Sequence, residues 1–102
     1  DSLTIELPVS FDEAALGAEV KIPALGGAPV TLKIPAGTPN GRTFRVRGKG
    51  VARKDGSKGD LLASVVVHVP ANLDAPAREA LEAYRLATAD KPLRQNLFEV
   101  SP

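Results

Sequence analysis

The sequence predicts a mainly β domain of antiparallel strands with a helix appended at its C-terminal end. Several segments alternate apolar and polar residues with a period of two, which is typical of half-buried strands. Nine prolines and nine glycines among 102 residues favour many short elements joined by turns. A helical pattern appears only after the last strand, and this order of elements argues against a βαβ fold.

The first part of the chain predicts a strand, a short helix and a hairpin. Residues 3–9 alternate, and a proline within them lacks a ladder donor, which indicates an edge strand. Ser10 and Glu13 have the spacing of a capping box, so a short helix is expected directly after Ser10. Residues 19–25 and 29–34 flank a pair of glycines, which is the pattern of a hairpin.

The strongest strand signal lies near the middle of the chain. Residues 43–47 resume the alternation after a turn rich in proline and glycine, and residues 60–69 form a longer alternating run. One face of the longer run is apolar throughout and the other is half apolar. This predicts a central strand that is covered on both sides. Residues 48–59 between the two strands are rich in glycine and lysine and are expected to form a flexible loop.

Beyond residue 70 the apolar pattern changes to a helical stripe. Asp74 is a good N-cap residue, and Leu73, Ala77, Leu81 and Tyr84 recur at helical spacing. A helix of about 15 residues is marginal alone in water, so this stripe must pack on another surface. That surface is either the chain's own sheet or a second copy of the chain.

The tail after the helix favours a second copy. It carries Leu97 and Phe98 beyond a helix-breaking proline, and an exposed apolar patch of this kind marks an interface. Burying the patch at ~25 cal/mol per Å² contributes several kcal/mol per chain, comparable with the stability of a small domain. We therefore predict a β domain over residues 1–70 and a homodimerisation helix and tail over residues 71–102. The predicted dimerisation residues are Leu81, Tyr84, Leu97 and Phe98.

Composition and motifs argue against an enzyme. The chain has no cysteine and a single histidine, His68, so thiol chemistry and a zinc site lack ligands and a hydrolase triad lacks support. The glycine-rich turn at residues 37–43 has the wrong spacing for a phosphate-binding loop. We expect no catalytic site, no metal and no cofactor. The lack of cysteine and of a membrane-spanning run favours a cytoplasmic protein.

A basic segment stands out against an acidic remainder. Residues 41–58 hold seven cations and one acid, whereas the rest of the chain holds six cations and eleven acids. The alternation places Arg45 and Arg47 on the exposed side of their strand and Phe44 on the inner side, and Lys49 follows in the loop. A solvated strand face with a flexible loop is the favoured interpretation. An acidic protein partner, or a nucleic acid bound through Arg45, Arg47 and Lys49, is the alternative.

Several separate motifs resemble one known family. The stretches "LTIELPVSFDEAALGAEVKIPAL", "VTLKIPAGTPNGRTFRVRGKGV" and "GDLLASVVVHVP", followed by a capped leucine-containing helix, closely resemble the second C-terminal domain of DnaJ-type co-chaperones. The resemblance extends over nearly the whole chain, from residue 3 to about residue 87. It implies a small antiparallel, β-sandwich-like domain with one short helix, followed by a dimerisation helix and tail.

The resemblance also implies a function. Members of the family hold unfolded protein clients on apolar surfaces of their C-terminal domains, deliver them to a DnaK-type chaperone and dimerise through the C-terminal segment. Leu62 and Val66, on the half-apolar face of the longest strand, are the candidate client-binding residues, and cover by the short helix is the alternative for them. The nucleic-acid-binding β module remains the second functional hypothesis.

Other parts of the family pattern do not occur in this sequence. There is no His-Pro-Asp tripeptide and no Cys-x-x-Cys-x-Gly-x-Gly repeat. The sequence also starts without a methionine, which is consistent with a piece of a longer protein. We therefore expect a fragment that dimerises and touches clients weakly, and that does not itself stimulate ATP hydrolysis.

Overall fold

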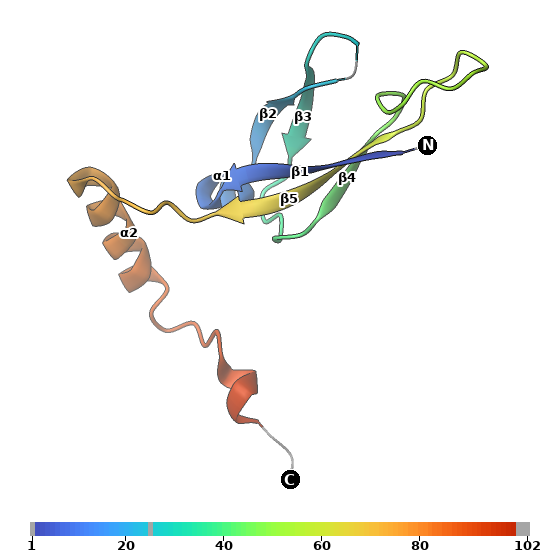
Figure 1. The fold of residues 1–102 in the computed structure, drawn as a ribbon. Coiled ribbons are helices and arrows are strands. Elements are labelled where there is room, and N and C mark those ends of the chain that lie inside the picture. Colours follow the sequence, from blue (N-terminus) through green and yellow to red (C-terminus); the bar gives the residue numbers. More distant parts are fainter. Residues whose placement is uncertain (1, 25, 100–102) are drawn as a thin grey trace. The chain divides into compact units, whose positions relative to one another are not determined.

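The structure is a computed structural model that describes residues 2–24 and 26–99 (Figure 1). The predicted hairpin-strand end at position 25 and the last tail residues, 100–102, therefore lie outside the described residues. The chain divides into two compact units, Asp1–Val69 and Pro70–Pro102. The elements are β1 (Leu3–Ser10), α1 (Phe11–Leu16), β2 (Ala18–Ile22), β3 (Val30–Ile34), β4 (Thr43–Val46), β5 (Leu61–His68), α2 (Ala75–Ala87) and the 3₁₀-helix η1 (Gln95–Phe98).

The first unit contains two small sheets, which confirms the mainly β class with one short helix. The first sheet has the strand order β1-β5-β4, and β2 and β3 form a separate antiparallel hairpin. The expectation that every strand is antiparallel is wrong at one pairing, because β1 runs parallel to β5 with Leu3 opposite Leu61. A period of two in the sequence indicates which face of a strand is buried. Because this period is the same in parallel and antiparallel pairs, it does not indicate the direction of pairing.

β5 is the central strand of the three-stranded sheet, as predicted. Its inner face places Leu61, Ala63 and Val65 in the core, each at most 1% exposed, and β1 adds Leu7 and Val9 beside them. The prediction that β5 is covered on both sides is wrong, because Val66 on the opposite face is 40% exposed. The sheet therefore has one inner face and one outer face that is partly open to solvent.

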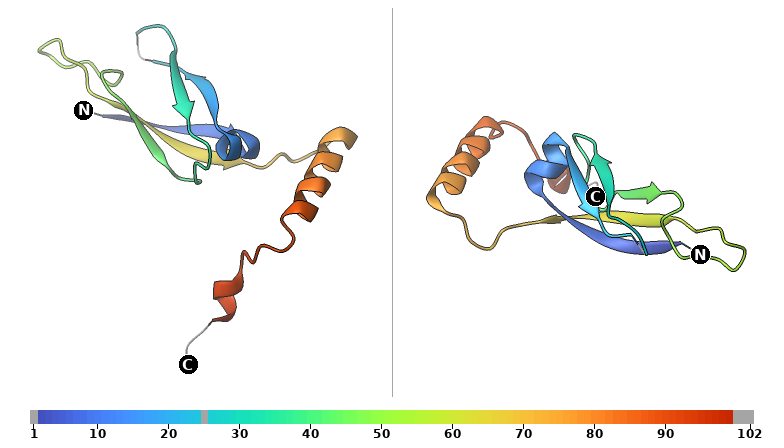
Figure 2. Two further views of the ribbon diagram at one scale, coloured as in Figure 1. Left: turned by 180° about the vertical axis from the view of Figure 1, so that it is seen from behind. Right: turned by 90° about the horizontal axis from the view of Figure 1, so that it is seen from above.

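The core lies between the three-stranded sheet, the β2–β3 hairpin and α1. Ile22 of β2 and Ile34 of β3 are each 1% exposed and belong to the same buried cluster as Ala14 of α1 and Val65 of β5. The two further views show the hairpin and α1 on the same side of the sheet (Figure 2). α1 therefore covers the inner face of the sheet and not its outer face.

The predicted capping box starts α1. The Ser10 hydroxyl oxygen accepts a hydrogen bond from the Glu13 N–H, and the Glu13 carboxylate accepts one from the Ser10 N–H at 2.9 Å. Gly17 ends the helix at a φ of 89°, a conformation that side chains with a Cβ rarely adopt. The helix is short because its terminal groups are satisfied within one and a half turns and β2 begins at the next residue.

The turn at residues 35–41 carries the chain from the hairpin to β4. Thr38 is buried and its hydroxyl donates to the Pro35 carbonyl at 2.6 Å. The Asn40 side-chain oxygen accepts the Val67 N–H at 2.9 Å, and the Gly41 N–H donates to the Val65 carbonyl at 2.8 Å. The turn is thus fastened to β5, which sets where β4 begins.

The second unit consists of α2, a connecting segment and η1. Asp74 caps α2 as predicted, because its carboxylate accepts the Ala77 N–H at 2.9 Å. None of the residues of α2 is buried. Among the described residues, no helix has both the length and the apolar character that crossing a bilayer requires.

Candidate functional site

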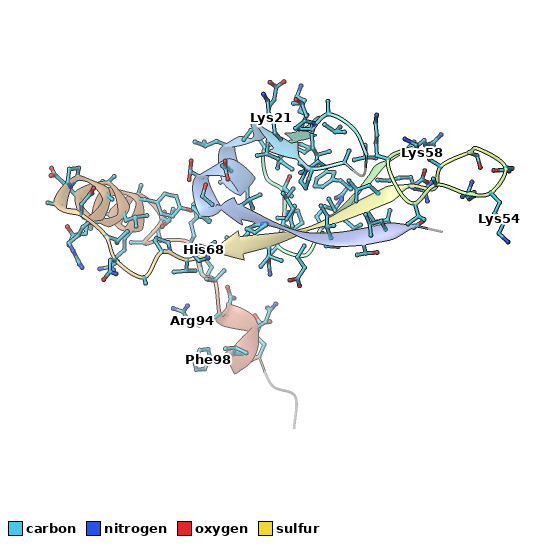
Figure 3. All side chains as sticks on the ribbon, turned by 45° about the horizontal axis from the view of Figure 1, so that its top comes forward. Lys21, Lys54, Lys58, His68, Arg94 and Phe98 are labelled. Atoms are coloured by element: carbon cyan, nitrogen blue, oxygen red, sulfur yellow. The ribbon has the colours of Figure 1, made fainter. Side chains whose placement is uncertain are left out.

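All four predicted dimerisation residues are exposed on the second unit. Leu81 and Tyr84 on α2 are 44% and 50% exposed, and Leu97 and Phe98 in η1 are more exposed still. Figure 3 shows the side chain of Phe98 on η1. Two further exposed leucines of the same unit, Leu86 and Leu93, were not predicted. Together these residues are called the helix–tail surface, which consists of Leu81, Tyr84, Leu86, Leu93, Leu97 and Phe98. The missed leucines fall outside the helical stripe, so periodicity alone does not find them.

The outer face of the sheet carries the two predicted client-binding residues. Leu62 is half-buried and Val66 is exposed, and both point away from the core side of β5. In the β1–β5 register Pro8 stands opposite Val66, which enlarges the apolar area at that end of the face. Ser64 lies between Leu62 and Val66 on this face, and its hydroxyl is hydrogen-bonded to the Thr43 hydroxyl at 2.8 Å. The outer face thus offers two apolar spots with a polar pair between them.

A hollow beside α1 is a candidate that the sequence analysis missed. It has a volume of about 410 Å³ and lies between α1, the turn at 37–40 and Val67. Phe11 and Ala15 line it from the helix and Pro39 lines it from the turn. The only sequence signal was an aromatic residue at the first position of a capped helix, which is also compatible with an ordinary surface position.

The basic segment forms an ordered extension of the β4–β5 pair. This extension, residues 47–60, is called the arm, and it projects beyond the strands (Figure 1). Its two sides are joined near the base by hydrogen bonds from the Gly50 N–H to the Gly59 carbonyl and from the Gly59 N–H to the Val51 carbonyl, both 2.9 Å. A bridge between Ala52 and Lys58 continues the pairing. The base of the arm is therefore a paired ribbon where the sequence predicted a loop.

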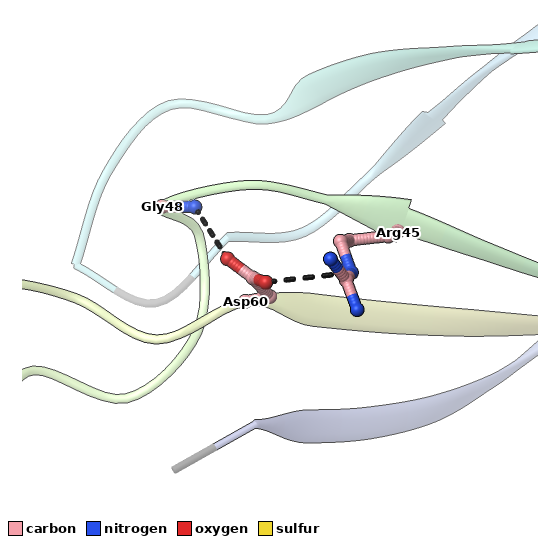
Figure 4. Close-up of polar contacts among 3 residues, drawn as sticks. All are labelled: Arg45, Gly48 and Asp60. Carbon is pink, nitrogen blue, oxygen red and sulfur yellow. Dashed lines mark hydrogen bonds and ion pairs between the residues drawn. The ribbon is translucent and has the colours of Figure 1, made fainter.

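Asp60 holds the base of the arm to β4. One of its carboxylate oxygens lies 3.5 Å from Nε of Arg45, and the other accepts the Gly48 N–H at 3.2 Å (Figure 4). A Cβ at position 50 would lie 2.3 Å from the Asp60 carbonyl oxygen, so only glycine fits beside this backbone. Asp60 was predicted only as the first residue of a strand, and nothing in the sequence indicates its bonds to Arg45 and Gly48.

Asp55 organises the tip of the arm. Its carboxylate accepts hydrogen bonds from the Ser57 hydroxyl at 2.6 Å and from the Ser57 N–H at 3.0 Å. These two bonds favour the charged form and hold the pKa of Asp55 below its ordinary value, the hydroxyl having the larger effect. The Arg53 N–H also donates to the Ser57 carbonyl at 2.7 Å, so the tip is a closed turn.

The predicted basic residues are exposed, but they do not share one environment. Arg45 is tied to Asp60, whereas Arg47 and Lys49 lie on the arm with no ion pair among the described residues. Phe44 is half-buried and packs against the core, as its place in the alternation predicted. The Arg42 guanidinium lies 5.8 Å from the centre of the Phe44 ring, within the range of a cation–π contact.

No candidate metal centre occurs in the described part of the chain. Groups of three or more histidine, cysteine, aspartate or glutamate side chains that could hold an ion are absent from residues 2–24 and 26–99. His68 is exposed at the end of β5.

Comparison with known proteins gives a single family. The family model described as "DnaJ C terminal domain" matches residues 1–70. "Chaperone protein DnaJ 1" of Streptomyces coelicolor is 60% identical over 101 residues, which are 99% of this chain and 25% of that protein. "Chaperone protein DnaJ 1" of Streptomyces albus G is 64% identical over 77 residues, which are 76% of this chain and 94% of that sequence.

The length of the match differs between relatives. The chain spans about a quarter of the Streptomyces coelicolor relative and 22% of "Chaperone protein DnaJ 2" of Cutibacterium acnes, to which it is 62% identical over 84 residues. The matched family model covers the first unit, which contains the sheets, the outer face and the arm. The chain belongs to the DnaJ C-terminal domain family.

Proposed function

We propose that this chain is the self-associating, client-binding C-terminal piece of a DnaJ-type co-chaperone. The observation that carries the proposal is the helix–tail surface, on which six large apolar side chains stand exposed within one short unit. The names of the relatives support the chaperone role, since they are called chaperone proteins. The longer protein then delivers unfolded clients to a DnaK-type chaperone.

The exposure of the helix–tail surface supports self-association. α2 has no buried residue, and Leu81 and Tyr84 remain 44% and 50% exposed, so a second copy can remove further apolar area from water. Apolar area removed from water contributes ~25 cal/mol per Å², and a twofold pairing buries one such patch on each chain. A homodimer that encloses Leu81, Tyr84, Leu97 and Phe98 therefore gains several kcal/mol per chain, on the order of the stability of a small domain.

Client binding is assigned to the outer face of the sheet. Leu62 and Val66 are four residues apart on one strand, which places them ~13 Å from each other at ~3.3 Å per residue. An extended client segment can touch both spots with side chains four residues apart, without any demand on the residues between them. Two small apolar contacts give weak binding with little sequence preference, which suits a protein that accepts many unfolded chains.

Sedimentation equilibrium tests self-association. The wild-type chain is expected to be dimeric, and Leu81→Asp with Phe98→Asp is expected to be monomeric, because two buried carboxylates per chain oppose the interface. Ala83→Asp with Asn96→Asp is the matched control, since it adds the same charge to the same elements and leaves the helix–tail surface intact. A monomeric wild type, or a control as monomeric as the test variant, contradicts the dimer.

A labelled apolar peptide without stable structure tests client binding by fluorescence anisotropy. Leu62→Ser with Val66→Ser is expected to weaken its binding several-fold, by roughly the loss of two small apolar contacts. His68→Ser, at the exposed end of the same strand, is the matched control. Equal affinity for wild type and the Leu62/Val66 variant contradicts the outer face, and a loss produced by Phe11→Ser instead assigns the clients to the hollow.

A further inference from the structure

The arm concentrates positive charge on an ordered hairpin. Its cations outnumber its acids, five to two, and both acids are engaged inside the arm or at its base. Asp60 forms an ion pair with Arg45 and accepts a hydrogen bond from the Gly48 N–H, and Asp55 accepts hydrogen bonds from Ser57. Both carboxylates keep their negative charge, so the net charge of the arm is +3.

Four cations of the arm are left without an anionic partner in the described part of the chain. They are Arg47, Lys49, Lys54 and Lys58. All four are exposed, and Figure 3 shows Lys54 and Lys58 on the projecting arm. Because the base of the arm is hydrogen-bonded and its tip is a closed turn, these charges stand on a preformed scaffold. Less conformational entropy is then lost when an anion binds than in a flexible loop.

We propose that the arm is a docking surface for a short, extended, acidic segment of a partner protein. The cations are distributed along both sides of the hairpin, which matches carboxylates spaced along an extended peptide. Val51, 45% exposed on the arm, adds an apolar contact for a neighbouring aliphatic side chain. The inference does not rest on the proposed dimer or on the outer face, which lie elsewhere in the chain.

Two observations favour an acidic peptide over a nucleic acid. The arm contains no aromatic residue, whereas proteins that bind single strands stack bases on exposed aromatic side chains. The remainder of the first unit, residues 1–46 and 61–69, holds five acids and four cations, so the excess of positive charge is confined to the arm. A short acidic segment can stay within the arm, whereas a long polyanion extends beyond its positive charge.

The test is fluorescence anisotropy with a labelled short peptide of alternating glutamate and serine. The wild-type chain is expected to bind it with an affinity that falls as salt rises. Lys49→Gln with Lys54→Gln and Lys58→Gln is expected to weaken binding about tenfold, since three exposed ion pairs of ordinary strength amount to about one decade. The corresponding triple change to arginine keeps the charge and is expected to keep the binding.

The matched control removes three lysines outside the arm. Lys21→Gln, Lys33→Gln and Lys91→Gln give the same net charge and are expected to leave the affinity within about twofold of wild type. Equal losses in the two triple variants mean that net charge alone attracts the peptide, which overturns the proposal. No binding at low salt overturns it as well. Tighter binding of DNA with an equal number of charges assigns the arm to nucleic acid and also overturns it.

Discussion

Asp60 and Arg45 are joined across the base of the arm, with a carboxylate oxygen 3.5 Å from the guanidinium Nε. The second oxygen of Asp60 accepts the Gly48 N–H, so one side chain links β4, the arm and the start of β5. The pair is partly exposed, with 59% of the Arg45 side chain and 30% of the Asp60 side chain accessible. Its main role is therefore to fix the direction of the arm, with a small contribution to global stability.

Asp60→Ala is expected to loosen the arm and to lower the free energy of unfolding by about 1 kcal/mol or less. Amide hydrogen exchange measures the first effect and urea denaturation the second. The Gly48 N–H should exchange faster, while the Val65 N–H, bonded to the Arg42 carbonyl at 2.8 Å, should keep its protection. Asp90→Ala removes an exposed carboxylate from the second unit as a control. Unchanged exchange at Gly48 contradicts the role given to Asp60.

Gly50→Ala is expected to destabilise the first unit by about 2 kcal/mol or more, because the new methyl group meets backbone atoms that cannot move aside. The added Cβ would lie 2.3 Å from the Asp60 carbonyl oxygen. Gly27→Ala is the control, since its Cβ meets nothing within 4 Å. It should change the free energy of unfolding by about 0.5 kcal/mol at most. Thermal denaturation of both variants decides the matter, and equal midpoints contradict the close packing at Gly50.

Val65→Ala and Val66→Ala separate the two faces of β5. Val65 is fully buried, so its truncation should cost about 2 kcal/mol of unfolding free energy from lost burial and the remaining cavity. Val66 is 40% exposed, and its truncation should cost about 1 kcal/mol or less. Urea denaturation gives both values. A larger loss for Val66 than for Val65 reverses the assignment of inner and outer face.

The tip of the arm should lose its order in acid. The pKa of Asp55 is lower in the folded arm than in an unfolded chain, because Ser57 bonds its charged form. Such a group adds stability above its unfolded-state pKa, and this contribution is lost as the pH falls through the folded-state pKa. An NMR titration of the Asp55 carboxyl and the Ser57 amide measures the change. Ser57→Ala should raise the pKa of Asp55 towards its ordinary value. An unaltered pKa contradicts the conclusion that the Ser57 hydroxyl lowers it.

Alternation in the sequence was sufficient to place the strands of the first unit. The run at residues 60–69 predicted a central strand, and Ser10 with Glu13 predicted the start of α1, because both signals depend only on neighbouring residues. The parallel partner of β5 was not predictable in this way. Leu3 and Leu61 are brought together only by the tertiary fold, and no local sequence pattern indicates that their strands run parallel.

The candidate surfaces also differ in how much of each could be predicted from local sequence. The apolar stripe of α2 indicated Leu81 and Tyr84, and both are exposed as an interface requires. Charge counting indicated the basic segment, but it could not tell an ordered arm from a flexible loop. That difference depends on the backbone bonds between Gly50 and Gly59 and on the carboxylate of Asp60, which the fold brings together.

The neighbouring positions of β1 and β5 have a consequence for synthesis on the ribosome. β1 is made first, yet its hydrogen-bonding partner begins at Leu61, after every other strand of the unit has been translated. Closing so long a loop costs entropy before any long-range contact forms, so the ladder cannot assemble until the chain has emerged past His68. A nascent chain arrested before that point should remain sensitive to protease, and one released beyond it should become resistant.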